Sequence, residues 1–142
     1  MSQLKLHKIK PDGRRTMCGP GAISAITGKP VSDIKEAAYD VKGCRYICGM
    51  TNFEVEQTLL QFGYHANCLL RLNGKVTFAK WLRDRKNDFM MNSLFLVQLT
   101  KHYVVVKGRK MVDNHTMEPV FIRKAPHRRR RVQTVWVINK LQ

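Results

Sequence analysis

Residues 17–29 read MCGPGAISAITGK, and this stretch decides the fold. It begins where a polar, basic N-terminal segment ends. Pro20 suits the first turn of a helix, because its missing N–H would have no intrahelical partner there. Gly28 is placed to end the same helix, since glycine adopts the left-handed conformation of a C-terminal cap. The stretch therefore predicts a helix over residues 18–27 with a thiol at its N-terminus.

Cys18 is the residue of this stretch that can carry chemistry. The partial positive charge of a helix N-terminus favours the thiolate over the thiol, and the thiolate is the nucleophilic form. Such a cysteine acts as a nucleophile when a histidine from another part of the fold reaches it. Free cysteine is also a common small core residue, so Cys18 alone leaves both interpretations open.

Three more helices are expected before residue 90. Two of them open with the spacing of a capping box, in which a Thr or Asp precedes a Glu by three residues. These are residues 33–41, with Asp33 and Glu36, and residues 51–62, with Thr51 and Glu54. A short third helix follows Thr77, and its apolar residues at helical spacing are expected to face the core. These apolar residues are Phe78, Trp81 and Leu82.

The second half of the chain has the pattern of β-strands, with short apolar runs separated by turn residues. The expected strands are residues 66–72, 94–99, 102–106, 110–113, 120–123 and 132–139. Helices followed by an antiparallel sheet define an α+β fold. No linker is long enough to divide the chain. We therefore expect a single domain over residues 1–142, with residues 1–16 as a basic N-terminal arm.

The composition is that of a globular protein, and 142 residues suffice for a core without disulfide bridges. No apolar run approaches the roughly 20 residues of a membrane helix. The N-terminus lacks the continuous apolar region of a signal peptide. The expected location is a reducing cytosol, in which the four cysteines serve as thiols or ligands.

The net charge of +16 is unevenly distributed. Residues 1–60 carry nine Lys or Arg and six Asp or Glu, whereas residues 61–142 carry seventeen and four. Such a surface attracts polyanions, including nucleic acid, acidic proteins and anionic lipid headgroups. The densest basic run is either a phosphate-binding patch without sequence specificity or a solvated loop before a strand. This run is Arg128, Arg129, Arg130 and Arg131.

His102 opens a strand that the chain leaves through a tight turn, predicted at residues 107–109. With a three-residue turn, position 102 faces position 114, so Asp113 or Asn114 returns beside His102, depending on register. A carboxylate that orients a histidine is the support that a Cys–His pair needs. His115 is a second candidate for the base, but it follows the hairpin without an obvious partner.

Four residues have the chemistry of zinc ligands, although the gap of three residues within the first pair is unusual. They are Cys44, Cys48, His65 and Cys68. The alternative interpretation is a thiol pair in a loop, a buried strand cysteine and an exposed histidine. Our prediction is that the protein uses neither a metal nor a cofactor.

Together these motifs resemble the papain-like cysteine peptidases, and more closely their bacteriocin-processing (C39-like) branch. The most similar group is that of small papain-like proteins of phages and prophages. Those proteins share a Cys-x-x-x-Ala helix ending in Thr-Gly-Lys, a Gly-Thr/Met-Thr before the next long helix, and a hairpin from His-x-x-x-Val to Val-x-Asp. The matching segments, which cover most of the chain, are residues 18–29, 49–64, 77–82, 102–106, 112–113 and 128–137.

The resemblance implies a papain-like fold, with N-terminal helices packed on a C-terminal antiparallel sheet. It also implies a catalytic triad of Cys18, His102 and Asp113. One position departs from the pattern, because the clan places a Gln of the oxyanion hole at about the position of Asp12. A carboxylate cannot donate a hydrogen bond and repels a developing oxyanion. The backbone N–H of Cys18, or a nearby Asn or Arg, is then the expected donor.

The function implied by the resemblance is hydrolysis of a peptide or isopeptide bond by a cysteine peptidase or amidase. Its substrate is then a peptide or protein. The alternative is a papain-like phage virion or accessory protein with weak or no activity, whose basic surface binds DNA, acidic proteins or virion assembly partners. The expected locations are the cytoplasm of a bacterial host or the phage virion.

Overall fold

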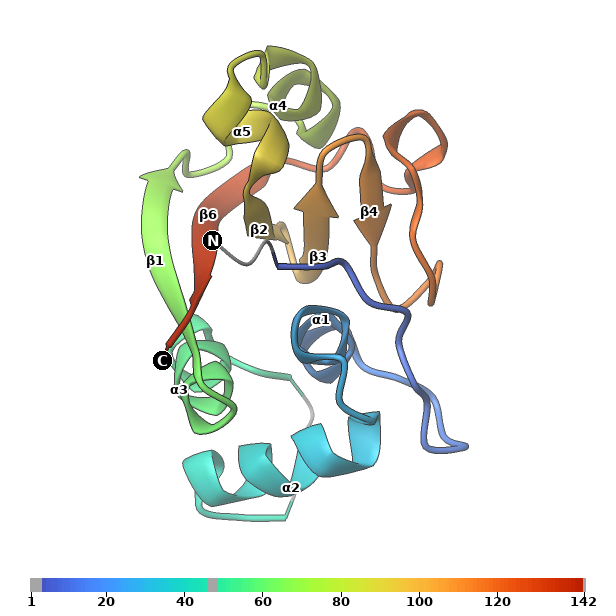
Figure 1. Ribbon diagram of the computed structural model, residues 1–142, viewed down its shortest axis with the longest axis vertical. Helices are drawn as coiled ribbons and strands as arrows, with labels where there is room; N and C mark the ends of the chain where they lie inside the picture. The colour runs from blue at the N-terminus through green and yellow to red at the C-terminus, as the bar shows by residue number, and fades with distance from the viewer. Residues whose placement is uncertain (1–3, 46–48, 142) are drawn as a thin grey trace.

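The computed structural model describes residues 4–45 and 49–141. Three helices come first and gather at one end of a sheet, as Figure 1 shows. They are α1 (Cys18–Thr27), α2 (Val31–Lys42) and α3 (Asn52–Gln61). Two short helices, α4 (Phe78–Asp84) and α5 (Asp88–Asn92), lie at the other end.

The sheet has six strands in the order β1-β6-β2-β3-β4-β5, and each neighbouring pair is antiparallel. Its strands are β1 (Tyr64–Arg71), β2 (Leu94–Leu99), β3 (His102–Lys107), β4 (Lys110–Val112), β5 (Val120–Phe121) and β6 (Val132–Lys140). The C-terminal strand β6 lies between β1 and β2, so it joins the early part of the chain to the β2–β3–β4 meander. The predicted α+β fold, with N-terminal helices on an antiparallel sheet, is confirmed.

The two faces of the sheet bury separate apolar clusters, because successive strand residues point to opposite faces. On one face, Ile23 and Ile26 of α1 pack with Tyr103 and Val105 of β3. On the other face, the predicted apolar side of α4 packs with neighbouring strand residues, among them Val104. Since β3 is covered on both faces, its position in the molecule is tightly fixed.

Residues 4–17 form neither a helix nor a strand, yet they are held against the body of the protein. The backbone N–H of His7 donates to the carbonyl of Ala25 in α1 at 2.9 Å. Ile9 is fully buried, and its N–H donates to the carbonyl of Met117 at 2.8 Å. The segment therefore ties α1 to the loop that follows β4.

One expected capping box forms and the other does not. Thr51 accepts a hydrogen bond from the N–H of Glu54, whose carboxylate in turn accepts one from the N–H of Thr51. Helix α2, by contrast, begins at Val31 with Pro30 as its N-cap and has no side-chain cap. The prediction of a start at Asp33 was wrong because Pro30, with its fixed φ of −61°, already sets the chain for a helix.

Two further details differ from the expectation. The predicted strand over residues 120–123 is a two-residue strand followed by a turn of 3₁₀ helix, Ile122–Lys124. Helix α5 was not predicted, since five residues are too few to show helical periodicity. Among the described residues, no helix has the length and apolar character needed to cross a bilayer.

Helices α1 and α2 end alike, and this gives a matched test of what fixes the end of α1. Gly28 and Gly43 cap them with φ of 75° and 76°. A Cβ on Gly28 would lie 3.1 Å from the His7 ring, whereas one on Gly43 meets nothing within 4 Å. Each Gly→Ala change costs about 1–2 kcal/mol for the left-handed backbone.

We therefore expect Gly28→Ala to lower the free energy of unfolding by more than Gly43→Ala, because only the former displaces the N-terminal segment. Urea titration followed by circular dichroism measures both. Equal losses in the two variants would show that the contact with His7 contributes nothing to the anchoring of α1.

Candidate active site

Cys18 is the first residue of α1 and is half-buried. The packing of α1 on β3 brings it close to the first residue of that strand, His102, whose side chain interacts electrostatically with the Cys18 sulfur. The backbone N–H groups of Gly19 and Tyr103 lie near the Cys18 sulfur and favour its ionised form. A residue near the N-terminus and one over 80 positions later thus meet at one end of the sheet.

His102 and Asp113 form a buried pair. Nε2 of His102 lies 2.9 Å from Oδ2 of Asp113, and the two side chains are 5% and 0% exposed. The other oxygen of Asp113, Oδ1, accepts the backbone N–H groups of His115 and Thr116, each at 2.9 Å. Because Asp113 holds Nε2, the Nδ1 atom of His102 is the one left for Cys18.

The register of the hairpin decides which residue becomes the partner of His102. Lys107 pairs with Lys110, so the turn has two residues rather than the predicted three, with Gly108 at φ 59°. Continuing that register places Asp113 opposite Val104, on the same face as His102. A three-residue turn would instead have placed Asn114 directly opposite His102. Asn114 donates to the carbonyl of Thr16 at 3.0 Å.

The interactions among Cys18, His102 and Asp113 favour a thiolate on Cys18 and an imidazolium on His102. Burial alone would raise the pKa of Cys18, but the bonds from His102 and from two backbone N–H groups lower it. Burial alone would lower the pKa of His102, but Asp113 and Cys18 raise it. Burial opposes ionisation of Asp113 too, yet the bonds from His102 and the backbone leave its pKa lowered.

Asp12 is engaged elsewhere. Its Oδ2 accepts from Nζ of Lys35 on α2 at 2.7 Å, and its Oδ1 accepts the N–H of Arg14 at 3.1 Å. The bond from Lys35 lowers the pKa of Asp12, which therefore stays ionised at neutral pH. As the first residue of α1, Cys18 has no carbonyl of its own helix to bond, so its N–H is available to an oxyanion.

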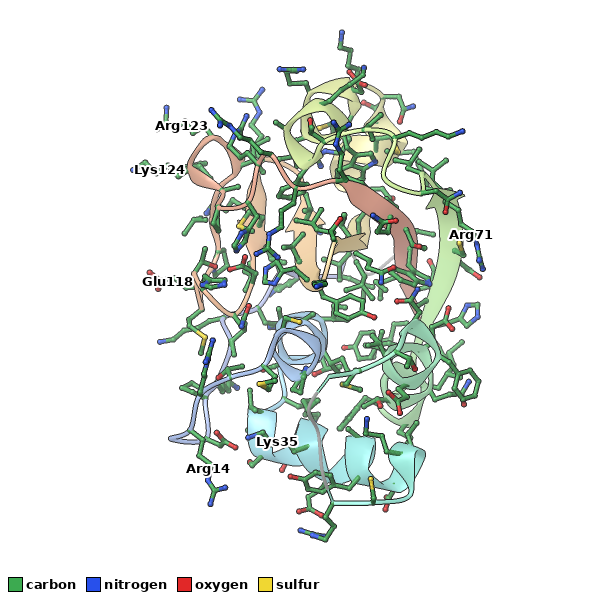
Figure 2. All side chains as sticks on the ribbon, turned by 180° about the vertical axis from the view of Figure 1, so that it is seen from behind. Arg14, Lys35, Arg71, Glu118, Arg123 and Lys124 are labelled. Atoms are coloured by element: carbon green, nitrogen blue, oxygen red, sulfur yellow. The ribbon has the colours of Figure 1, made fainter. Side chains whose placement is uncertain are left out.

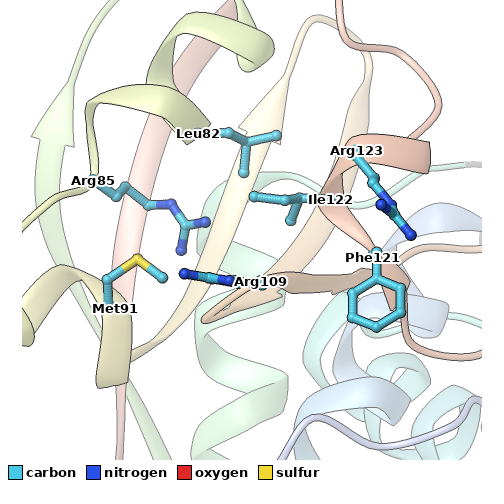
Figure 3. A pocket seen from close by; sticks show the side chains of 7 residues that line it. All are labelled: Leu82, Arg85, Met91, Arg109, Phe121, Ile122 and Arg123. Carbon is cyan, nitrogen blue, oxygen red and sulfur yellow. The ribbon is translucent and has the colours of Figure 1, made fainter.

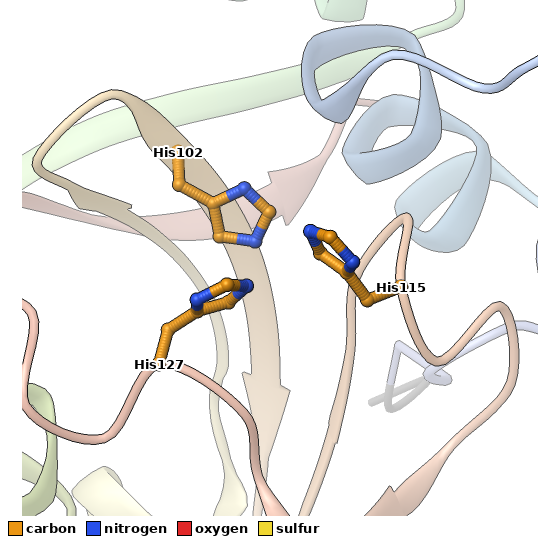
Figure 4. A group of neighbouring side chains, drawn as sticks. All are labelled: His102, His115 and His127. Carbon is orange, nitrogen blue, oxygen red and sulfur yellow. The ribbon is translucent and has the colours of Figure 1, made fainter.

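Two further histidines surround His102, as Figure 4 shows. The ring centroids of His115 and His127 lie 5.5 Å and 4.6 Å from that of His102. One ligand atom from each of the three lies within 4.8 Å of the other two. Zinc at 2.0–2.1 Å from tetrahedral ligands needs nitrogens roughly 3.4 Å apart. The rings would have to close in and His102 would have to release a partner, so the present geometry favours the Cys18–His102–Asp113 arrangement.

The other zinc candidates are not assembled in the part of the chain that the structure describes. Cys68 is exposed on the edge strand β1, and His65 is half-buried three residues before it on the same strand. Cys44 is exposed in the loop after α2. Cys48 lies outside the described residues. Among those described, only the three histidines form a cluster of metal-ligand type.

Two arginines of the basic run before β6 hydrogen-bond to backbone carbonyls, and the other two are exposed on the surface. Arg128 donates to the carbonyl of Ile122 at 2.6 Å, and Arg130 donates to that of Thr100 at 3.2 Å. Arg129 and Arg131 are exposed. Figure 2 shows other basic side chains, such as Arg71, pointing outward elsewhere, so the positive charge is not confined to this run.

Three residues around the site were not predicted from the sequence. Thr116 holds the Asp113 backbone, and Asp-x-x-Thr is a recognisable turn pattern. Tyr103 donates from its hydroxyl to Oδ1 of Asn52 at 2.6 Å, which links β3 to the start of α3. His127 comes from a turn far along the chain, and nothing in the local sequence points to it.

The fold is that of the papain-like peptidases. The peptidase domain of Streptococcus ComA, a bi-functional ABC transporter involved in a quorum-sensing pathway, superimposes with a TM-score of 0.57. The sequences are 13% identical, and the match covers 96% of this chain and 99% of the ComA domain. No family model matches the sequence, and no curated protein does so either.

The lowered pKa of Cys18 predicts its reactivity with an alkylating agent. A lowered pKa means that the thiolate persists to lower pH than in the unfolded chain, where the thiol pKa is about 8.5. We expect the midpoint of iodoacetamide labelling at Cys18, followed by peptide mass spectrometry against pH, to lie below that of the urea-unfolded protein. His102→Ala should raise the midpoint, and an unchanged midpoint would contradict the pairing.

A second test concerns the buried carboxylate. In Asp113→Asn the amide oxygen must remain on the N–H groups of His115 and Thr116, so its NH₂ faces Nε2 of His102, donor against donor. The charge of Asp113 is lost as well, so the pKa of His102 falls and the thiolate of Cys18 is less favoured. We expect the labelling midpoint of Cys18 to rise, while Glu118→Gln, which changes an exposed side chain, leaves it in place. Equal profiles would rule out an orienting role for Asp113.

Proposed function

We propose that this protein is a papain-like cysteine peptidase or amidase of C39-like type, acting on a peptide or isopeptide bond. The single observation that supports it is the placement of Cys18 beside His102, which is hydrogen-bonded to buried Asp113, on a papain-like fold. Cys18 is the nucleophile, His102 the general base and acid, and Asp113 the group that orients the imidazole.

In the first half of the proposed reaction, the Cys18 thiolate attacks the carbonyl carbon and a C–S bond forms. The N–H of Cys18 stabilises the oxyanion. The His102 imidazolium gives the proton on Nδ1 to the leaving amine as the C–N bond breaks, which leaves a thioester. In the second half, water attacks the thioester, His102 accepts its proton, and the acid product leaves with the thiolate restored.

The tautomer of His102 follows from its partner. Asp113 is ionised and accepts at Oδ2, so Nε2 carries a hydrogen throughout the cycle and Nδ1 exchanges the reacting proton. His127 stands beside the ring, and burial together with the nearby His102 lowers its pKa. It therefore stays neutral at pH 7 and does not compete for the proton of Cys18.

A second candidate function is favoured by Asp12. Asp12 has the sequence position at which the resemblance implies an oxyanion amide, but it is a carboxylate paired with Lys35 and donates no hydrogen bond to an oxyanion. The protein would then act as an accessory scaffold whose basic surface binds nucleic acid or acidic proteins. The phage or prophage origin and the virion association remain predictions from the resemblance.

Peptide turnover separates the two functions. We expect the wild-type protein to cleave members of a proteome-derived peptide library, with new termini identified by mass spectrometry, and Cys18→Ala to cleave none. Cys68→Ala, which removes an exposed thiol of β1, is the matched control and should retain full activity. Rapid selective labelling of Cys18 without any cleavage would favour the accessory function. Slow labelling and no cleavage would contradict both the proposed mechanism and an intact site.

A further inference from the structure

A cavity of about 480 Å³ lies far from Cys18 (Figure 3). It adjoins the turn after β3, whereas His102 begins that strand, and a six-residue strand separates the two points by roughly 17 Å. Its walls come from α4, α5, the β3–β4 turn and the segment around β5. The lining residues are Leu82, Arg85, Met91, Arg109, Phe121, Ile122 and Arg123.

Arg85 is the unusual member of this set. It directly follows α4 and is only 4% exposed. Its Nη2 donates to the carbonyl of Gly108 at 2.7 Å, and its guanidinium lies 5.3 Å from the Trp81 ring centroid. Its Nε and Nη1 are buried without a hydrogen-bond partner among the described residues. A buried charged donor left unpaired is costly, so these two groups call for an acceptor.

The cavity holds more positive charge than the protein itself neutralises. Arg109 and Arg123 line it together with Arg85, and none of the described residues that line it is acidic. Burial lowers the pKa of Arg85 to about 10, so it remains a cation at neutral pH. Figure 3 shows the side chains of Arg85 and Arg109 both reaching into the cavity. An anion between them would relieve their repulsion and supply the missing acceptors.

The remaining walls are apolar, which favours an anion attached to an organic body. Leu82, Met91 and Ile122 flank the arginines, and Phe121 is 48% exposed beside them. A neighbouring hollow shares Met91, Arg109 and Phe121 and adds two lysines. The volume is in the range of small-molecule sites, roughly 300–1,000 Å³.

We propose that this cavity binds the phosphoryl group of an organic phosphate, held by Nε and Nη1 of Arg85 and by the guanidinium of Arg109. A phosphate monoester carries a charge close to −2 and three acceptor oxygens, which match two guanidinium groups better than a carboxylate does. The organic part lies against Phe121 and Ile122. The phosphate can belong to a free small molecule or to the 5′ end of a nucleic acid strand, since the recognised chemistry is the same.

Isothermal titration calorimetry in 150 mM salt tests the proposal with phenyl phosphate and adenosine monophosphate. Arg109→Gln and Arg85→Met remove the two guanidinium groups, and Arg83→Gln removes an equal charge from the exposed side of α4. We expect saturable binding that both cavity variants weaken by roughly tenfold or more, the loss expected for hydrogen bonds to a charged group. Arg83→Gln and Cys18→Ala should bind as the wild type does.

A single-stranded oligonucleotide with and without a 5′-phosphate distinguishes the two sources. Tighter binding of the phosphorylated strand, lost in Arg109→Gln, assigns the site to a strand end; binding of the small phosphates alone assigns it to a free metabolite. Absence of saturable binding of every probe overturns the proposal. So does an equal loss in Arg83→Gln, which indicates unspecific charge attraction. Arg109 is exposed in a turn, so its variant remains informative if Arg85→Met fails to fold.

Discussion

The buried hydrogen bond between His102 and Asp113 is the constraint on which the rest of the site depends. A carboxylate that is completely buried needs a partner for each oxygen, because an uncompensated buried charge is costly. Asp113 finds them in His102 and in two backbone N–H groups of the turn that follows. The pair therefore fixes the orientation of the imidazole, and it leaves Nδ1 of His102 for Cys18.

Three features of the fold bring His102, Asp113 and Cys18 together. The sheet buries β3 on both faces, the two-residue turn sets the register, and α1 packs where its N-terminus reaches the start of β3. The N-terminal segment reinforces this arrangement, since Ile9 bonds the loop after β4 while His7 bonds α1. The position of Cys18 thus depends on backbone contacts on either side of it, and not on the three side chains alone.

Much of this could be predicted from the sequence because its signals are local. Residues 18–27 have helix start and stop signals, and the continuous apolar run in β3 marks a buried strand. Sequence could not settle whether Asp113 or Asn114 meets His102, since that depends on whether a turn has two or three residues. It also could not find His127 or pair Asp12 with Lys35, because those contacts join distant segments through tertiary packing alone. The burial of Arg85 was not predicted either, because a basic residue at a helix end normally faces solvent.

The positive charge of the chain thereby divides into three physically different kinds. Arg128 and Arg130 donate to backbone carbonyls, so part of the charge stabilises loops near β6. Exposed residues such as Arg129 attract polyanions without selectivity, and salt screens that attraction. Arg85 differs from both, because its side chain is buried and two of its N–H groups donate to no acceptor among the described residues. Net charge alone therefore says little about binding, whereas a buried, unpaired guanidinium beside a cavity specifies both a place and a chemistry.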